Sequence, residues 1–256
     1  MRASSVWECE FERQGFAVLR GLVDLQAVDE ARSQADRVER AWRHGGGLGD
    51  YDQLRVLERD APGSGRVLDG VQGVFRHFEP YQRLRSHPSI TGLLQQKIGS
   101  DLVSVVDTLF FKPPRQPGTG IAFHRDAQFR KPPECFRDLA GSYVQVGLPL
   151  EPHGPENGGL VFVIGSHRDL SLDATQHHSV RGIDDLGSTL DIEGSELEAV
   201  ELSPGDIVVW HPYTIHGSPP NRSTTKSRKF YVVGYMAAHA CDVGEPVIGH
   251  NSGPAG

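Results

Sequence analysis

The feature that most constrains the fold is a change in hydrophobic period near residue 101. Upstream of it, apolar residues recur at three- and four-residue steps, as on one buried face of a helix. Downstream, the apolar runs are short, alternate with a period near two, and end at turn residues such as Ser203-Pro204-Gly205-Asp206. A series of short strands of this kind is typical of a sandwich or barrel. The sequence therefore predicts a mainly β fold with flanking helices, most of them in the first hundred residues.

The same patterns predict individual elements. Helices are expected over 24–43 and 88–98, because each range has one apolar stripe and suitable residues at its ends. Residues 11–20 should begin with a polar turn and continue as a short strand, and residues 44–74 should form a loop with short irregular strands. The strands of the core are expected at 102–106, 108–111, 143–150, 159–164, 207–211 and 229–235.

Two polar stretches are expected to lie outside this core. Residues 168–200 are rich in Asp, Ser, Gly and His, and predict a long surface insertion. An insertion of that length is uncommon unless it forms a lid or is disordered. Residues 237–256 are expected to form a C-terminal tail.

Composition excludes several classes of partner. The net charge of −7 argues against nucleic acid or an anionic membrane surface. No apolar run is long enough to cross a membrane, and the N-terminus has no signal-peptide pattern.

The three cysteines, Cys9, Cys135 and Cys241, are odd in number and lack C-x-x-C spacing, which favours a reducing cytoplasm over a disulfide framework. Nothing in the sequence indicates the oligomeric state.

The first chemical motif is His124-Arg125-Asp126. Residues two apart on a strand point to the same face, so His124 and Asp126 could both face one metal ion. His216 follows a distant predicted strand and could supply a third ligand. Two histidines and one carboxylate on one face, with open positions opposite, are the arrangement of non-haem Fe(II) oxygenases.

The second motif surrounds Arg228, which begins the last predicted strand. A guanidinium can hold a carboxylate through two parallel hydrogen bonds, and the Ser218 hydroxyl could add a third. A dicarboxylate could therefore chelate the metal at one end and be held at the other.

These residues occur within a larger set of motifs. The set comprises His124-x-Asp126, Glu156-Asn157-Gly158-Gly159-Leu160-x-Phe162-Val163-Ile164-Gly165-Ser166-His167, the 203–206 turn, and His216-Gly217-Ser218 with Asn221, Ser223 and Arg228. From about residue 10 to 236 this pattern resembles the phytanoyl-CoA dioxygenase family. That family belongs to the Fe(II)- and 2-oxoglutarate-dependent oxygenases, which have a double-stranded β-helix (jelly-roll) core.

The resemblance implies a cofactor set and residues to bind it. Fe(II) would be bound at a catalytic centre formed by His124, Asp126 and His216. The distal carboxylate of 2-oxoglutarate would be bound by Arg228 and Ser218, with Thr108 as a further cosubstrate contact. O₂ would be the oxidant. The resemblance also implies a single oxygenase domain over 1–256, with a helix-rich support region at 1–100 and a jelly-roll core at 101–236.

The sequence departs from the family pattern at three places. Arg125 stands where the family usually has Gln, and strand alternation points it away from iron. The loop before Arg228 is one residue longer than usual, which makes Arg222 the alternative carboxylate clamp. Gly147 replaces a common aromatic residue and would leave extra room beside the cosubstrate. Asp126 itself is retained, whereas related halogenases lack this carboxylate, so oxygen transfer is favoured over halogenation.

Other polar and aromatic residues near the motifs have less defined roles. Gln128 and Phe129 follow the metal motif and are candidates for substrate contact. His167 and His211 are expected to be structural, and the pair at 177–178 to be solvated within the insertion.

The reaction implied is hydroxylation of an unactivated C–H bond in a small-molecule metabolite or natural-product intermediate, with release of succinate and CO₂. The same cofactors support desaturation, cyclisation or epimerisation in relatives, and these stay open. One alternative of another class is a jelly-roll binding module without catalysis. A second is a cupin-like metal enzyme, such as an isomerase, that does not use 2-oxoglutarate.

Overall fold

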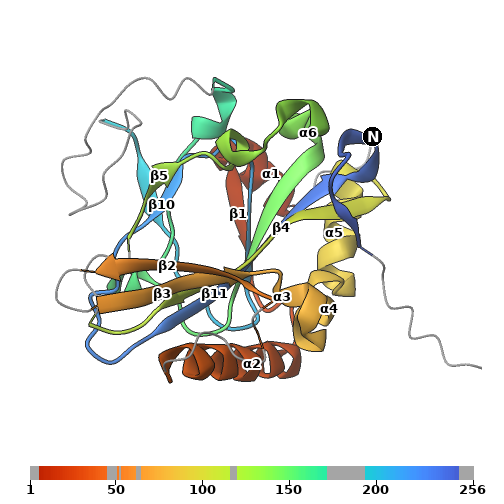
Figure 1. Ribbon diagram of the computed structural model, residues 1–256. Helices are drawn as coiled ribbons and strands as arrows, with labels where there is room; N and C mark the ends of the chain where they lie inside the picture. The colour runs from red at the N-terminus through yellow and green to blue at the C-terminus, as the bar shows by residue number, and fades with distance from the viewer. Residues whose placement is uncertain are drawn as a thin grey trace, which may run out of the picture.

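The computed structural model describes residues 6–44, 51, 53–61, 65–115, 120–171 and 194–247. Over these ranges the chain forms an eight-stranded and a four-stranded sheet, each with antiparallel neighbours. Helices cover the outer face of the larger sheet, and the smaller sheet lies on its other side (Figure 1). The predicted mainly β fold with flanking helices is confirmed.

The large sheet has the strand order β1-β9-β6-β11-β4-β3-β2, and β12 also pairs with β4. Its strands are β1 (Phe16–Leu19), β2 (Arg55–Ala61), β3 (Gly65–Gln72), β4 (Leu102–Lys112), β6 (Tyr143–Pro149), β9 (Ile207–Trp210), β11 (Arg228–Ala237) and β12 (Glu245–Pro246). The prediction of two strands over 102–111 is wrong, since β4 is continuous. Asp107 stays in the strand because its carboxylate accepts the Phe75 N–H at 3.1 Å, so this polar residue does not start a turn.

The small sheet has the order β5-β10-β7-β8. Its strands are β5 (Ile121–His124), β7 (Val161–Val163), β8 (Leu197–Ala199) and β10 (His216–Ser218). They are short because each lies between turns, and β10 also breaks register with β5 between His216 and Ser218. This sheet therefore carries few residues, but four of the predicted site residues lie in it or directly beside it: His124, His216 and Ser218 in its strands, and Asp126 just after β5.

Six helices accompany the sheets over the described ranges. They are α1 (Val6–Gln14), α2 (Leu25–Arg43), α3 (Val74–His77), α4 (Glu79–Arg85), α5 (Pro88–Ile98) and α6 (Leu139–Ser142). The predictions for α2 and α5 are confirmed, including the Asp24 cap, whose carboxylate accepts the Ala27 N–H at 2.8 Å. The polar turn expected at the start of 11–20 is wrong. Helix α1 covers it and ends at Gly15, whose φ of +91° suits glycine.

The hairpin of β2 and β3 was not predicted as regular structure. Residues 44–74 were expected to form a loop with short irregular strands, but two regular strands pair from Arg55 opposite Gln72 to Ala61 opposite Gly65. Gly70 allows β3 to approach β4, since a Cβ there would lie 2.8 Å from the Leu109 carbonyl oxygen. The polar residues that made this stretch look like a loop face solvent or a cavity, because β2 is an edge strand.

Two apolar cores lie on opposite faces of the large sheet. One joins α2, α4 and α5 to the sheet and buries residues such as Val38, Leu94 and Leu109. The other lies between the sheets, where the rings of Phe16 and Phe162 stack with centroids 4.3 Å apart. The inner core closes one side of the space in which the site residues meet.

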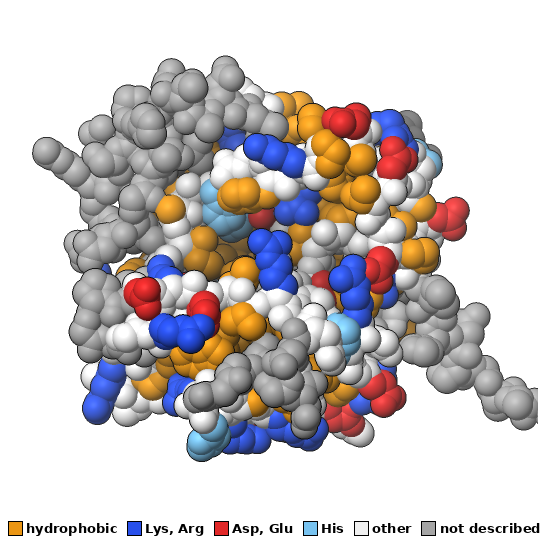
Figure 2. Space-filling model, viewed as in Figure 1, with side chains coloured by type: hydrophobic (Ala, Val, Ile, Leu, Met, Phe, Trp, Pro, Cys, Tyr) orange, Lys and Arg blue, Asp and Glu red, His pale blue; other side chains and the backbone are white. Residues whose placement is uncertain are grey.

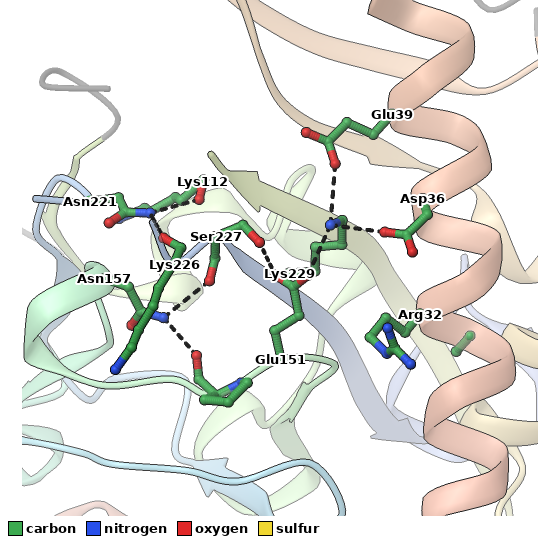
Figure 3. Close-up of polar contacts among 12 residues, drawn as sticks. Arg32, Asp36, Glu39, Lys112, Glu151, Asn157, Asn221, Lys226, Ser227 and Lys229 are labelled. Carbon is green, nitrogen blue, oxygen red and sulfur yellow. Dashed lines mark hydrogen bonds and ion pairs between the residues drawn. The ribbon is translucent and has the colours of Figure 1, made fainter. Parts of the chain in front are cut away.

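A cluster of charges ties α2 to the start of β11. The Lys229 ammonium lies 3.0 Å from the Asp36 carboxylate, 3.2 Å from Glu39 and 2.9 Å from Glu151 (Figure 3). Burial alone would lower the pKa of Lys229, but these carboxylates hold it above its ordinary value. Ser227 donates to the other oxygen of Glu151 at 2.8 Å. The strand is therefore anchored on its outer face at the residue after Arg228.

The two stretches predicted outside the core are partly described. Residues 172–193 of the expected lid lie outside the described residues, and 197–199 form β8. In the expected tail, Glu245 and Pro246 pair with Ser104 and Val103, so this part adds a short strand to the sheet. Over the described ranges, no helix is both long and apolar enough to cross a bilayer.

Candidate active site

The structure brings His124, Asp126 and His216 together at one end of a cavity of about 1050 Å³. One potential ligand atom from each lies within 4.8 Å of the others. The Asp126 carboxylate is 3.7 Å from Nε2 of each histidine, through different oxygens. The expectation that both motif residues share one strand is corrected. His124 ends β5, and Asp126 opens a 3-10 helix, Asp126–Phe129.

Backbone carbonyls orient both imidazoles. Nδ1 of His124 lies 2.8 Å from the Ala122 carbonyl oxygen, and Nδ1 of His216 lies 3.0 Å from that of Thr214. Since a carbonyl only accepts, each Nδ1 carries the proton and donates it. Each Nε2 therefore offers a lone pair toward the common centre, as a metal ligand must.

Asp126 is held by Trp210, which the sequence analysis did not identify. The indole Nε1–H donates to Oδ2 of Asp126 at 2.7 Å, and both side chains are buried. Asp126 begins a 3-10 helix, so strand pairing does not fix its position. The bond from Trp210 fixes the carboxylate instead. The only sequence signal was a tryptophan at the end of the apolar 207–210 run, six residues before His216.

The charge states of Asp126 and His216 suit metal binding. Burial alone would raise the pKa of the Asp126 carboxyl, but the neighbouring His216 and His124 hold it below its ordinary range. Burial, with the nearby His124, lowers the pKa of His216 to about 4. At neutral pH Asp126 is therefore an ionised carboxylate and His216 is neutral, which are the forms that coordinate a cation. Burial would lower the pKa of His124, but the neighbouring Asp126 carboxylate holds it above its ordinary value, so a bound cation would compete with a proton at this imidazole.

Arg228 enters the same cavity from β11 and is almost fully buried. Its Nε and Nη1 have no hydrogen-bond partner among the described residues. Burial lowers the pKa of the guanidinium to about 9. A buried cation with unused donors is costly unless an anion completes it, so this geometry fits a carboxylate ligand. Arg222, the alternative clamp, is exposed.

Lys112 is a second buried basic side chain beside Arg228 that the sequence analysis did not assign, and burial, together with the Arg228 charge, lowers its pKa well below the ordinary lysine value. It lies opposite Arg228 in the β4–β11 ladder, and its ammonium donates to Ser218 Oγ at 2.6 Å and the Ser218 carbonyl at 2.9 Å. Ser218 Oγ donates in turn to the Gly158 carbonyl at 2.8 Å. The Ser218 hydroxyl therefore lies beside the clamp with its hydrogen engaged by Gly158. Lys112-Pro113-Pro114 was visible in the sequence only as a strand end.

The remaining candidates also line the cavity. Thr108 lies in β4, and its hydroxyl accepts from the Gln72 amide at 3.2 Å. Gln128 is half-buried, while Phe129 is 56% exposed with its ring centroid 5.4 Å from that of His124. The structure thus places these three residues in the wall of the cavity that the triad also lines.

Two of the departures from the family pattern, Arg125 and Gly147, can be compared with the structure. The expectation for Arg125 is confirmed, and that for Gly147 is wrong. Arg125 points away from the triad as expected, and its guanidinium binds Asp169 at 2.9 Å and the Ser171 carbonyl. The extra room expected at Gly147 is wrong. A Cβ there would lie 2.3 Å from Cζ of Phe230 and 3.0 Å from Trp210, so rings from neighbouring strands fill that space.

Two further histidines have structural contacts. His167 Nε2 lies 3.1 Å from the Glu12 carbonyl oxygen, and His211 Nε2 lies 3.0 Å from that of Ala140. Both tie loops to the backbone, as predicted. The 177–178 histidine pair lies outside the described residues.

Comparison with known proteins adds an independent finding. A family model described as phytanoyl-CoA dioxygenase (PhyH) matches residues 11–230, which include all three triad residues and Arg228. A probable alpha-ketoglutarate-dependent hypophosphite dioxygenase of Stutzerimonas stutzeri is 24% identical over 200 residues, covering 76% of this chain and 66% of the relative. The matched part thus spans just under two thirds of that relative's length.

Two other similarities concern enzymes with different reactions. A 1-deoxypentalenic acid 11-beta-hydroxylase of Streptomyces exfoliatus is 25% identical over 227 residues, covering 83% of this chain and 73% of the relative. The epimerase SnoN, solved in complex with Fe³⁺, alpha-ketoglutarate and nogalamycin RO, has the same fold, with a TM-score of 0.67 and 24% identity. That match covers 94% of this chain and 85% of SnoN.

Proposed function

The chain belongs to the phytanoyl-CoA dioxygenase family of Fe(II)- and 2-oxoglutarate-dependent oxygenases, and on this premise we propose that it hydroxylates an unactivated C–H bond of a small molecule. The reaction would consume O₂ and release succinate and CO₂. We take residues 1–256 as one oxygenase domain. Its three free cysteines suit the reducing cytoplasm in which we place it.

In this proposal the iron ligands are Nε2 of His124, Nε2 of His216 and the Asp126 carboxylate. Two imidazoles and one carboxylate on one side leave the opposite side open to other molecules. Bound Fe(II) with 2-oxoglutarate supplies the oxidising chemistry, in which the cosubstrate loses CO₂ and O₂ is activated. Trp210 and the two backbone carbonyls keep the ligands in the required orientation.

Arg228 would hold the distal carboxylate of 2-oxoglutarate through its unused Nε and Nη1 donors. Lys112 adds a basic group at this end of the cavity, and Ser218 accepts a hydrogen bond from its Nζ. Thr108 would contact the cosubstrate from β4. The Phe230 ring centroid lies 5.5 Å from Cζ of Arg228, and an apolar ring at this position would strengthen an ion pair that Arg228 forms with the cosubstrate.

The single observation that carries the proposal is that the metal-binding cluster and a buried arginine with unused donors share one cavity. A structural ion-pair network would instead leave the arginine with a carboxylate of the protein. The size of the cavity suits a small chelating dicarboxylate and a small substrate better than a macromolecule, since the space is about 1050 Å³.

The proposal is tested by incubating the protein with Fe(II), 2-oxoglutarate, O₂ and a panel of small metabolites. We expect succinate in a ratio near one to a product that has gained one oxygen atom. A product of unchanged mass would indicate epimerisation, and loss of two hydrogens desaturation or cyclisation. No succinate with any candidate, together with no binding of 2-oxoglutarate, would favour a binding module without catalysis. Binding of 2-oxoglutarate that is unchanged in Arg228→Ala would revive the cupin-like alternative.

A further inference from the structure

We propose that the substrate carries an oxyanion, either a carboxylate or a phosphorus oxyanion, and that Arg55 and Arg130 bind it at the mouth of the cavity. This inference rests on the proposed oxygenase function, because the molecule concerned is the one bound over the metal triad. It adds the chemical class of the substrate and two residues that select it.

The cavity is basic although the protein is acidic. Its described lining includes six Lys and Arg side chains and four Asp and Glu side chains. The whole chain, in contrast, has a net charge of −7. A concave site with a charge opposite to the rest of the surface concentrates ligands of the complementary sign. The positive charge of the cavity lining favours an anionic ligand.

Two of these arginines are already neutralised by the protein. Arg59 lies 2.9 Å from the Asp69 carboxylate, and Arg76 forms an ion pair with Glu245. The first pair joins β2 to β3, and the second joins α3 to β12. Neither arginine therefore has a charge to offer a ligand.

Two other basic side chains, Arg228 and Lys112, lie where we place the distal carboxylate of 2-oxoglutarate. They would therefore be engaged by the cosubstrate. Arg228 and Lys112 lie opposite each other in the β4–β11 ladder and are buried. In the proposed complex, Arg228 would bind the distal carboxylate of the cosubstrate, and the metal would bind the other carboxylate. Among the described residues, no further cation lies there for a substrate group.

Arg55 and Arg130 are left, and among the described residues neither forms an ion pair. Arg55 begins β2, is exposed, and its side chain has no hydrogen-bond partner in the described chain. Arg130 follows the 3-10 helix that begins at Asp126 and is half-buried. Its Nε reaches only the Asp126 carbonyl, at 3.4 Å, and its guanidinium lies 5.7 Å from the Tyr143 ring centroid. Both Nη groups of Arg130 remain available, and together they can hold an oxyanion in a bidentate manner.

The two arginines come from different elements of the cavity wall. One element is the β2–β3 hairpin, and the other is the segment that carries the metal ligand Asp126. Figure 2 shows Lys and Arg side chains on both sides of a hollow whose floor is largely apolar. Leu57, Phe110, Phe129 and Val232 are among the apolar lining. The site therefore fits a molecule with an apolar body near the metal and an anionic group at the mouth.

The experiment uses the anaerobic protein loaded with Fe(II) and 2-oxoglutarate. The visible charge-transfer absorption of that complex reports cosubstrate binding, and its change reports a molecule entering above the metal. Phenylacetate, benzylphosphonate and phenylacetamide serve as probes, because they share a ring and differ in charge. We expect both anions to bind about tenfold more tightly than the amide, and the tighter anion identifies the kind of oxyanion.

Arg55→Gln and Arg130→Gln are expected to remove most of this preference while the absorption of the 2-oxoglutarate complex stays unchanged. Arg76→Gln is the matched control, since it removes a paired arginine from the same cavity and should leave the preference intact. Equal binding of the amide and the anions by the unmodified protein, or an intact preference in both test variants, would overturn the inference. Absence of the charge-transfer band from the unmodified protein would instead count against the proposed function itself.

Discussion

His124 and His216 lie directly opposite each other in the ladder that pairs β5 with β10, and their ring centroids are 4.3 Å apart. The spacing of these two proposed ligands therefore follows from backbone pairing. A slip of one residue in that register would turn one imidazole to the other face of the sheet. Asp126 has no such constraint, because it begins a 3-10 helix, and its position depends on a side-chain contact.

Trp210→Phe should weaken metal binding about 10- to 100-fold. The change keeps an aromatic ring in the inner core and removes the Nε1–H that holds Asp126 Oδ2 at 2.7 Å. Anaerobic titration of the metal-free protein with Fe(II) measures the effect. Trp42→Phe is the control, since Trp42 Nε1 also bonds a carboxylate, that of Glu58 at 3.1 Å, far from the triad in the fold. Equal affinities in the two variants would refute a role for the indole in ordering the ligand.

Arg228→Met should make the ligand-free protein more stable by about 1–3 kcal/mol, because it removes a buried cation whose donors are unused. The same change should abolish the increase in melting temperature that 2-oxoglutarate gives the unmodified protein. Thermal unfolding with and without 2-oxoglutarate measures both effects. The exposed Arg222→Met variant should behave as the unmodified protein. A variant that is destabilised and still stabilised by 2-oxoglutarate would rule out Arg228 as the clamp.

Asp107→Asn should change how stability depends on pH. Burial raises the pKa of Asp107 to about 6, although the Phe75 N–H opposes this. A carboxyl whose folded pKa is raised contributes stability below its unfolded pKa near 4. That contribution is lost as pH rises through about 6, so the unmodified protein should lose about 2–3 kcal/mol across this window from this group.

The amide introduced by Asp107→Asn can still accept the Phe75 N–H and does not ionise, so the variant should lack this loss and be the more stable protein at pH 7. Urea unfolding at several pH values checks it. Asp60→Asn, an exposed change on β2, controls for the loss of one negative charge. If the stability difference between Asp107→Asn and the unmodified protein is the same at every pH, Asp107 does not titrate as stated.

Gly147→Ala should destabilise the protein by about 1–3 kcal/mol, since the new methyl would overlap the Phe230 ring. Displacement of that ring should also weaken 2-oxoglutarate binding, because Phe230 lies against Arg228. Gly92→Ala on α5 is the control, with nothing within 4 Å of the added Cβ and a helical position that favours alanine. Unaltered stability and cosubstrate affinity in Gly147→Ala would mean that the ring is not held there.

The sequence was sufficient for the elements whose patterns are local. Helix α5 and its Gly99 stop follow from an apolar stripe and terminal signals, and the core strands follow from alternation. The hairpin at 55–72 could not be predicted, because an edge strand that faces a polar cavity shows no clear alternation. The continuous β4 was missed for a related reason, since Asp107 is accommodated by a partner, Phe75, from a distant helix.

In the candidate site, too, some residues could be predicted from the sequence and others could not. The triad and Arg228 were found because their residue types and order carry chemistry. Trp210 and Lys112 were missed because their roles depend on contacts across strands: the indole reaches Asp126, and the ammonium reaches Ser218. The space beside Gly147 was misjudged because the ring that fills it comes from Phe230, far along the chain.

The adjacent residues Arg228 and Lys229 divide two tasks between the faces of one strand. On the outer face, Lys229 is compensated by Asp36, Glu39 and Glu151, which belong to the protein at all times. On the inner face, Arg228 has two donors without a partner among the described residues, which the proposed cosubstrate carboxylate would complete. Lys229 thus attaches α2 to the sheet, whereas we expect Arg228 to contribute to ligand affinity at a cost to the stability of the ligand-free protein. Evolution can alter the preference for a cosubstrate at this strand while the attachment of α2 is preserved.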